Sequence, residues 1–251
     1  MKLSNMITRV RAWAGLSRLL GVRGGTQTLH LCELHKSVCC AGLPTIDVKG
    51  ILDRIRPDRN GEPSRIIMHP TGLSIGSGSM AEMACICAIV AVKKPKTILE
   101  FGTFDGCSAW HMLANAPSDT NLITLDLPSN TKTARSTDFG LQGVASRPFL
   151  PDSPRVNLIE IDSREWVPKV EGGADLCFID AGHSYECVKN DTEKALAVMN
   201  KGGVILWHDT TWRRDDYGVN SYMKELLAKG QDVRLIGVGR VDYSGLAVMI
   251  V

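Results

Sequence analysis

Four short apolar segments of this sequence each end in an aspartate, in a part of the chain where strand and helix patterns alternate. The four aspartates are Asp126, Asp162, Asp180 and Asp209, and a further apolar segment, residues 97–102, precedes them. Apolar strands that alternate with helices indicate a parallel sheet covered on both faces. Ligands of such sheets bind at the carboxyl ends of the strands, where these acids fall. The sequence therefore predicts a ligand site at one edge of an α/β sheet.

The remaining patterns complete the predicted fold. Helices are expected at residues 106–116, 185–200 and 219–229, and two closing strands, 232–239 and 244–251, are joined by a turn too short for a crossover helix. A short turn makes two strands antiparallel. We therefore expect an α/β fold with a Rossmann-like, seven-stranded, mostly parallel sheet and an antiparallel C-terminal strand.

The chain divides near a turn-rich stretch at residues 56–63. Before it, helical patterns at 6–20 and 28–56 predict a helical N-terminal extension, residues 1–66, that acts as a cap or in dimerisation. After it, Ser79 and Glu82 form a Ser-x-x-Glu capping box ahead of an apolar helix, within a second domain of residues 67–251.

Residues 1–32 contain five basic residues and no acid. They are expected to pack on the domain or on a second subunit as a homodimer, with an organellar presequence or a basic helix at a membrane surface as alternatives. No run of 18 apolar residues exists, so no transmembrane segment is expected. The net charge of +2 gives no reason to expect nucleic acid as a partner.

Eight cysteines are present, and none forms a Cys-x-x-Cys pair or a zinc-type spacing. Most of them lie inside apolar segments. We interpret them as free thiols in a reducing compartment, and we therefore expect a cytoplasmic protein.

The turn after residues 97–102 carries two glycines, Gly102 and Gly106. A glycine-rich turn between a strand and a helix lets the backbone approach a ligand, and the helix N-terminus offers N–H groups. A dinucleotide fold expects Gly-x-Gly-x-x-Gly, and the third glycine is missing here. Glu100 would repel a pyrophosphate but suits a cation. The turn therefore favours a cationic ligand.

The stretch Ile98-Leu-Glu-Phe-Gly-Thr-Phe-Asp-Gly-Cys-Ser-Ala109 resembles the first motif of class I methyltransferases. It is closest to small-molecule O-methyltransferases of the catechol and macrolide-sugar type, which read Glu-x-Gly-x-x-x-Gly-x-Ser. The resemblance runs from about residue 72 to the C-terminus. It implies S-adenosylmethionine as cofactor, which carries an ammonium and a sulfonium group, and a small hydroxylated molecule as methyl acceptor.

The resemblance also assigns the residues that hold this cofactor. The methionine end would meet Glu100 and Gly102, and Asp126 would accept hydrogen bonds from both ribose hydroxyls. Thr103, Phe104 and Gly106 would form the turn that surrounds the cofactor, and Ser108 would contact it from the start of the helix. Asp162 and Ser163 would lie by the adenine, and Asp180 is also expected to bind the cofactor. Asp126 as a simple strand-end acid, and Asp162 with Ser163 as a helix cap, are the alternatives.

A second group of residues follows the fourth and fifth strands. By resemblance, Asp180, His208 and Asp209 would hold a divalent metal, Mg or Mn, although a histidine ligand tilts the site away from magnesium. Asp180 and His183 are the expected catalytic residues, with His183 as the general base that removes the proton of the substrate hydroxyl. The alternatives are that His183 and Ser184 cap a helix, and that His208 is a buried histidine bound to Asp180.

Two loops are candidate lids, residues 128–153 with Arg135 and Arg147, and residues 210–218. Trp207, Trp212 and Tyr217 are expected as walls of the pocket.

Three other functions fit the same fold or a similar one. An RNA or protein methyltransferase is disfavoured because the chain has neither a strongly basic character nor an Asn/Asp-Pro-Pro-aromatic motif. A nucleotide-dependent oxidoreductase is disfavoured by the missing glycine. A non-catalytic module that binds the cofactor stays open.

Overall fold

The computed structural model describes residues 43–56, 65–70, 78–128, 131, 147–210, 218–237 and 245–251. The predictions for residues 1–32, for the 56–63 turn beyond Arg56, and for Arg135, Trp212 and Tyr217 lie outside these residues. Of the helices that the structure describes, none is both long and apolar enough to cross a membrane.

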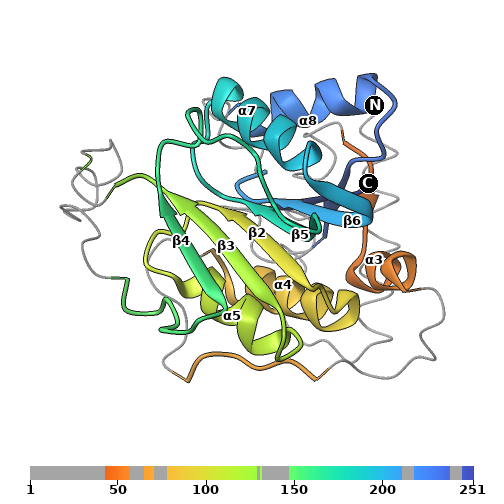
Figure 1. Cartoon of the computed structure of the whole chain (residues 1–251). Helices are drawn as coiled ribbons and strands as arrows, with labels where there is room; N and C mark the ends of the chain where they lie inside the picture. Colours follow the sequence, from red (N-terminus) through yellow and green to blue (C-terminus); the bar gives the residue numbers. More distant parts are fainter. Residues whose placement is uncertain are drawn as a thin grey trace.

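One eight-stranded sheet forms the centre of the described fold (Figure 1). Its strand order is β1-β7-β8-β6-β5-β2-β3-β4, and only β8 runs antiparallel to its neighbours. The strands are β1 (Thr45–Ile46), β2 (Thr97–Phe101), β3 (Asn121–Asp126), β4 (Val156–Glu160), β5 (Ala174–Ile179), β6 (Met199–Trp207), β7 (Arg234–Ile236) and β8 (Leu246–Ile250).

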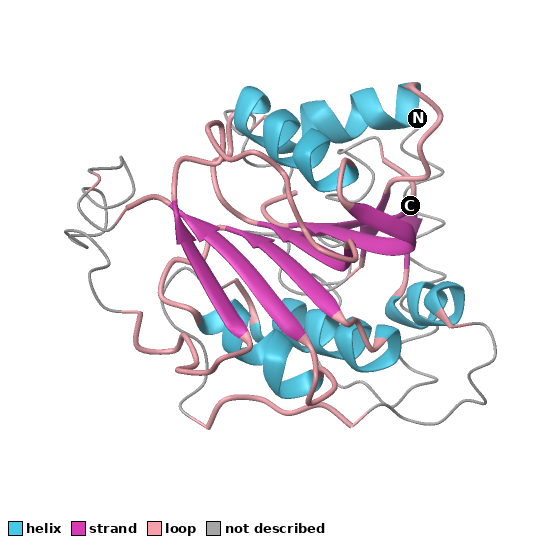
Figure 2. Ribbon diagram, in the orientation of Figure 1, coloured by secondary structure: helices cyan, strands magenta, loops and turns pink. Residues whose placement is uncertain are grey.

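Helices cover both faces of the sheet (Figure 2). On one face lie α3 (Val48–Ile55), α4 (Met80–Lys93) and α5 (Cys107–Asn115), and on the other α7 (Tyr185–Leu196) and α8 (Val219–Ala228). Successive residues of a strand point to opposite faces, so Ile98 packs in the core with α4 and α5 while Leu99 packs in the core with α7 and α8. This double burial explains the continuous apolar strands.

The helix α4 begins where the capping box predicted it. The Ser79 hydroxyl accepts the Glu82 N–H at 3.2 Å, and the Glu82 carboxylate accepts the Ser79 N–H at 2.7 Å. These bonds satisfy two backbone groups that a helix start leaves without intrahelical partners. The helix ends at Lys94 in a left-handed conformation, one residue before Pro95.

The predicted Rossmann-like, mostly parallel sheet with its antiparallel C-terminal strand is confirmed, and the strand count is corrected from seven to eight. The additional strand, β1, comes from the predicted N-terminal extension and pairs parallel with β7. The expected helical piece at 28–56 therefore contains a strand and then α3. A two-residue strand is too short to show a periodicity of its own. The division near residue 66 stays a prediction.

The carboxyl ends of β2 and β5 meet at the point where the strand order reverses. Asp180 donates its N–H to the Phe101 carbonyl at 2.8 Å, and a Cβ on Gly102 would lie 2.3 Å from the Asp180 carbonyl oxygen. Only glycine fits there, and its φ of +97° also favours glycine. The two halves of the candidate site are therefore held together by direct backbone contact.

Candidate active site

The turn after β2 adopts left-handed backbone at alternate positions. Gly102, Phe104 and Gly106 have φ angles of +97°, +49° and +87°. Phe104 is unusual, because residues other than glycine rarely adopt this backbone conformation. Its backbone N–H donates a hydrogen bond to the Asp126 carboxylate at 2.7 Å. At Gly106, a Cβ would lie 2.3 Å from the Leu150 nitrogen. The turn is therefore compact, and a compact turn at the start of a helix can bring its backbone N–H groups close to a ligand.

Glu100 lies behind this turn and is completely buried. It accepts hydrogen bonds from the Ser108 and Thr124 hydroxyls, both at 2.5 Å, and Thr124 in turn contacts the Thr103 hydroxyl at 2.6 Å. Burial raises the pKa of Glu100 to about 8, against the lowering effect of these hydroxyls. The predicted cofactor residues Glu100, Thr103 and Ser108 therefore form one buried network under the turn.

Asp126 ends β3 beside the turn. Its carboxylate accepts the N–H groups of Phe104 and Leu127 at 2.7 and 2.8 Å, and Arg147 lies 3.6 Å away. Burial raises the pKa of Asp126 and outweighs these partners. About a quarter of the side chain, 24%, stays exposed, so a ligand can still reach it.

The predicted adenine contacts are arranged differently from each other. Asp162 is bound by the Arg164 guanidinium, which lowers the pKa of the Asp162 carboxyl. The Ser163 carbonyl accepts a hydrogen bond from the Lys194 ammonium at 2.5 Å. Both residues follow the edge strand β4, and Ser163 is joined to α7 through Lys194.

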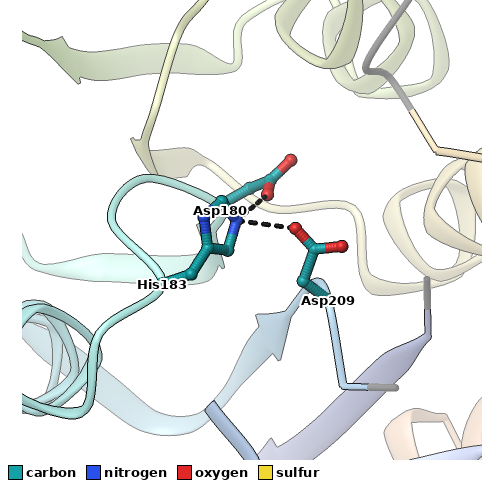
Figure 3. A group of neighbouring side chains, drawn as sticks. All are labelled: Asp180, His183 and Asp209. Atoms are coloured by element: carbon teal, nitrogen blue, oxygen red, sulfur yellow. Dashed lines mark ion pairs between the residues drawn. The ribbon is translucent and has the colours of Figure 1, made fainter. Parts of the chain in front are cut away.

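Asp180, His183 and Asp209 converge from the ends of β5 and β6 (Figure 3). The Nε2 atom of His183 lies 2.6 Å from Asp209 Oδ2 and 3.6 Å from Asp180 Oδ1. Burial opposes the charged ring, but the two carboxylates outweigh it and raise the pKa of His183. Burial would raise the pKa of both aspartates, but His208 and His183 lower the pKa of Asp180, and His183 and His208 lower that of Asp209.

His208 shares Asp180 and Asp209 with His183 and also faces Glu82. Its Nδ1 lies 3.4 Å from Asp180 Oδ1 and 3.7 Å from Asp209 Oδ1, while its Nε2 lies 3.8 Å from Glu82 Oε2. It is buried among acids, which raise its pKa well above the ordinary value despite its burial. The alternative role, a buried histidine hydrogen-bonded to Asp180, agrees with its burial, and the hydrogen bond stays a prediction.

Glu82 is a residue of this site that sequence reasoning missed. It was assigned only to the capping box of α4, and it fulfils that role, but its carboxylate is 1% exposed and turned to His208. Glu82 and His208 are 126 positions apart in the chain. No local pattern in the sequence signals that contact, because it depends on how α4 packs under the sheet edge.

The loop that carries His183 is fixed from both sides. Ser184 is the N-cap of α7 and accepts the Cys187 N–H at 3.2 Å, so the capping part of the alternative applies to Ser184. The His183 carbonyl accepts the Gly218 N–H at 2.7 Å, at the start of α8. The start of α8 therefore positions the histidine.

The donor set of this site fits a metal ion. Asp180, His183 and Asp209 each offer one ligand atom, and these atoms lie within 4.8 Å of one another. The expected ligand set contained His208, whose Nδ1 lies 3.4 Å from Asp180 and 3.7 Å from Asp209, while its Nε2 is turned towards Glu82. Two carboxylates and an imidazole suit manganese, iron or zinc better than magnesium. The predicted ligand set of Asp180, His208 and Asp209 stays a prediction.

The expected aromatic wall is wrong for Trp207. This side chain is completely buried in the core with α7 and α8, and its Nε1 donates to the Thr192 hydroxyl at 2.9 Å. Trp207 is the last residue of β6, and successive side chains of a strand point to opposite faces of the sheet. At this position the side chain points into the core.

Comparisons with known proteins agree with this geometry. Residues 99–210, which contain the turn and the Asp180–Asp209 region, match a family model described as a methyltransferase domain. None of the curated proteins matches the sequence.

Solved structures have the same fold. A proposed O-methyltransferase from Klebsiella pneumoniae superposes with a TM-score of 0.53 and 22% identity, over 83% of this chain and 91% of that one. An O-methyltransferase from Bacillus cereus in complex with SAH has a TM-score of 0.50 and 16% identity, over 83% and 92%. These solved structures share the fold of this chain, and its residues 99–210 are similar to a methyltransferase domain.

Proposed function

We propose that this protein methylates a hydroxyl group of a small molecule, with His183 as the general base. The observation that carries the proposal is the convergence of His183 with Asp180 and Asp209, beside the backbone contact that joins Gly102 to Asp180. In this proposal, His183 is the proton acceptor next to the turn of residues 102–106, which we call the cofactor turn. The O-methyltransferase names of the two neighbours above agree with an oxygen acceptor.

The cofactor half fits S-adenosylmethionine, which supplies an electrophilic methyl group when bound. The shaped turn at 102–106 would lie against it, Asp126 would accept from its ribose, and the Glu100 network would hold the turn beneath its methionine end. The proposal assigns Gly102, Thr103, Phe104, Gly106, Ser108 and Asp162 to the same half. It also assigns Ser163, which follows the edge strand β4, to this half.

The acceptor half uses His183 to move a proton. If the neutral ring keeps its proton on Nε2, which lies 2.6 Å from Asp209, its lone pair is on Nδ1, and a base oriented by a carboxylate recurs in enzymes that activate hydroxyl groups. Asp180 and Asp209 then stabilise the imidazolium that forms. If a metal occupies the three-residue site, it would lower the hydroxyl pKa, and His183 would serve as ligand instead of base.

Replacement His183→Ala tests this role. We expect turnover of labelled S-adenosylmethionine, measured on a panel of phenols and sugars, to fall about 10²–10⁴-fold. Affinity for S-adenosylhomocysteine should stay within about twofold, because His183 lies outside the cofactor half. Unchanged turnover would remove His183 from the mechanism, and lost binding would indicate a structural role.

Removal of divalent metal separates the two forms of the mechanism. If a metal holds the acceptor, dialysis against a chelator abolishes turnover, and Mn²⁺ restores it in the wild type but not in Asp209→Asn. If His183 acts as base alone, the chelated enzyme keeps full activity. Metal content measured on the purified protein gives an independent check of which form is present.

A further inference from the structure

Arg147 lies at the carboxyl ends of β3 and β4 and is nearly buried. Its side chain is 9% exposed, with Nη1 at 3.0 Å from Glu160 and Nη2 at 3.6 Å from Asp126. Asp126 and Glu160 are register partners on the two strands. The guanidinium therefore lies beside the acid that the proposed function assigns to the ribose.

The backbone after Arg147 is attached to the cofactor turn. The Phe149 N–H donates to the Asp105 carbonyl at 3.1 Å, and Leu150 approaches Gly106 so closely that no Cβ fits between them. Leu150 also donates its N–H to the Arg147 carbonyl at 3.0 Å. Arg147 is thus held in a fixed position next to the turn.

The guanidinium has donors to spare. Its distance of 3.6 Å from Asp126 is longer than a hydrogen bond. Its Nε is buried, and no group among the described residues accepts a hydrogen bond from it. A buried donor without an acceptor is costly. The partly exposed Asp126 beside it can accept further hydrogen bonds.

A group that completes both residues must donate to Asp126 and accept from Arg147, and a hydroxyl does both. We propose that Arg147 is a cofactor-binding residue that donates to a ribose hydroxyl whose hydrogen Asp126 accepts. The proposal rests on the proposed function, since it takes Asp126 as the ribose acid. It adds a basic residue from the loop between β3 and β4 to the nucleoside half of the site.

Calorimetric titration with S-adenosylhomocysteine tests the proposal on the full chain. The variants are Arg147→Met, Asp126→Asn and the double variant, with Arg155→Met as control, because Arg155 precedes the opposite end of β4. We expect Arg147→Met to weaken binding about tenfold, and the control to change it less than about twofold. In the Asp126→Asn background, Arg147→Met should weaken S-adenosylhomocysteine binding less than about twofold, because both residues act on the same ribose hydroxyl.

Two results overturn the proposal. One is an Arg147→Met protein that binds within twofold of the wild type. The other is an equal loss in both backgrounds, which indicates that Arg147 only holds its loop in place. If Arg147→Met does not fold, Arg147→Lys takes its place in the cycle with the same criteria, since it keeps the charge but loses the planar set of donors. A wild type that fails to bind S-adenosylhomocysteine contradicts the proposed function itself.

Discussion

At the scale of single residues, Glu100 shows how one acid can serve both the fold and the ligand. The sequence placed it as a partner of a cationic ligand. The structure buries it completely and binds it to Ser108 and Thr124, so that its pKa rises to about 8. Glu100 therefore supports the turn through its hydrogen bonds with Ser108 and Thr124. With a pKa of about 8, its carboxyl group is mostly protonated near neutral pH.

This burial predicts a dependence of stability on pH. The folded pKa of about 8 lies above the ordinary 4.5, so between these values the folded chain keeps a proton that the unfolded chain loses. Stability from this group is complete below pH 4.5 and is lost as pH rises through 8, with a slope of at most about 1.4 kcal/mol per pH unit. Glu100→Gln should remove that slope.

Urea unfolding of both proteins at a series of pH values measures it. The difference in free energy of unfolding, wild type minus Glu100→Gln, should fall steadily from pH 5 to pH 8. Two curves that run parallel over this range would show that Glu100 titrates alike in both states.

At the scale of elements, the start of α8 controls the position of His183. Gly218 donates its N–H to the His183 carbonyl, and a Cβ on Gly218 would lie 1.9 Å from the Tyr185 nitrogen. Its φ of −72° is ordinary, so glycine is required here by the close approach and not by its conformation. The two helices α7 and α8 therefore meet through a residue that has no side chain.

Gly218→Ala should push the two helix starts apart. We expect a loss of about 1–3 kcal/mol in stability and a fall in turnover of at least about tenfold, because the added methyl group displaces the loop of the base. Gly237→Ala is the matched control, since its Cβ would meet nothing within 4 Å among the described residues. That variant should stay within about 0.5 kcal/mol. Equal effects of both substitutions would argue against the positioning role.

At the scale of the whole molecule, the sequence predicted the elements better than their contacts. Continuous apolar strands and the Ser79–Glu82 cap follow from local rules, so the sheet and α4 could be anticipated. The two-residue strand β1 could not, because its pairing with β7 joins distant parts of the chain. The approach of Glu82 to His208 also escaped, since it depends on how α4 packs near the end of β6.

The whole fold should respond to its ligand as one unit. A molecule that binds only the folded chain stabilises it by about 2.7 kcal/mol at one hundred times its dissociation constant, which for a domain of this size raises the melting temperature by about 5–10 °C. We expect S-adenosylmethionine and S-adenosylhomocysteine to produce this shift, and NAD to produce none, because the turn lacks the third glycine of a dinucleotide site. His183→Ala should keep the shift and Asp126→Asn should lose most of it. A shift with NAD as large as that with S-adenosylhomocysteine would favour an oxidoreductase despite the matched domain.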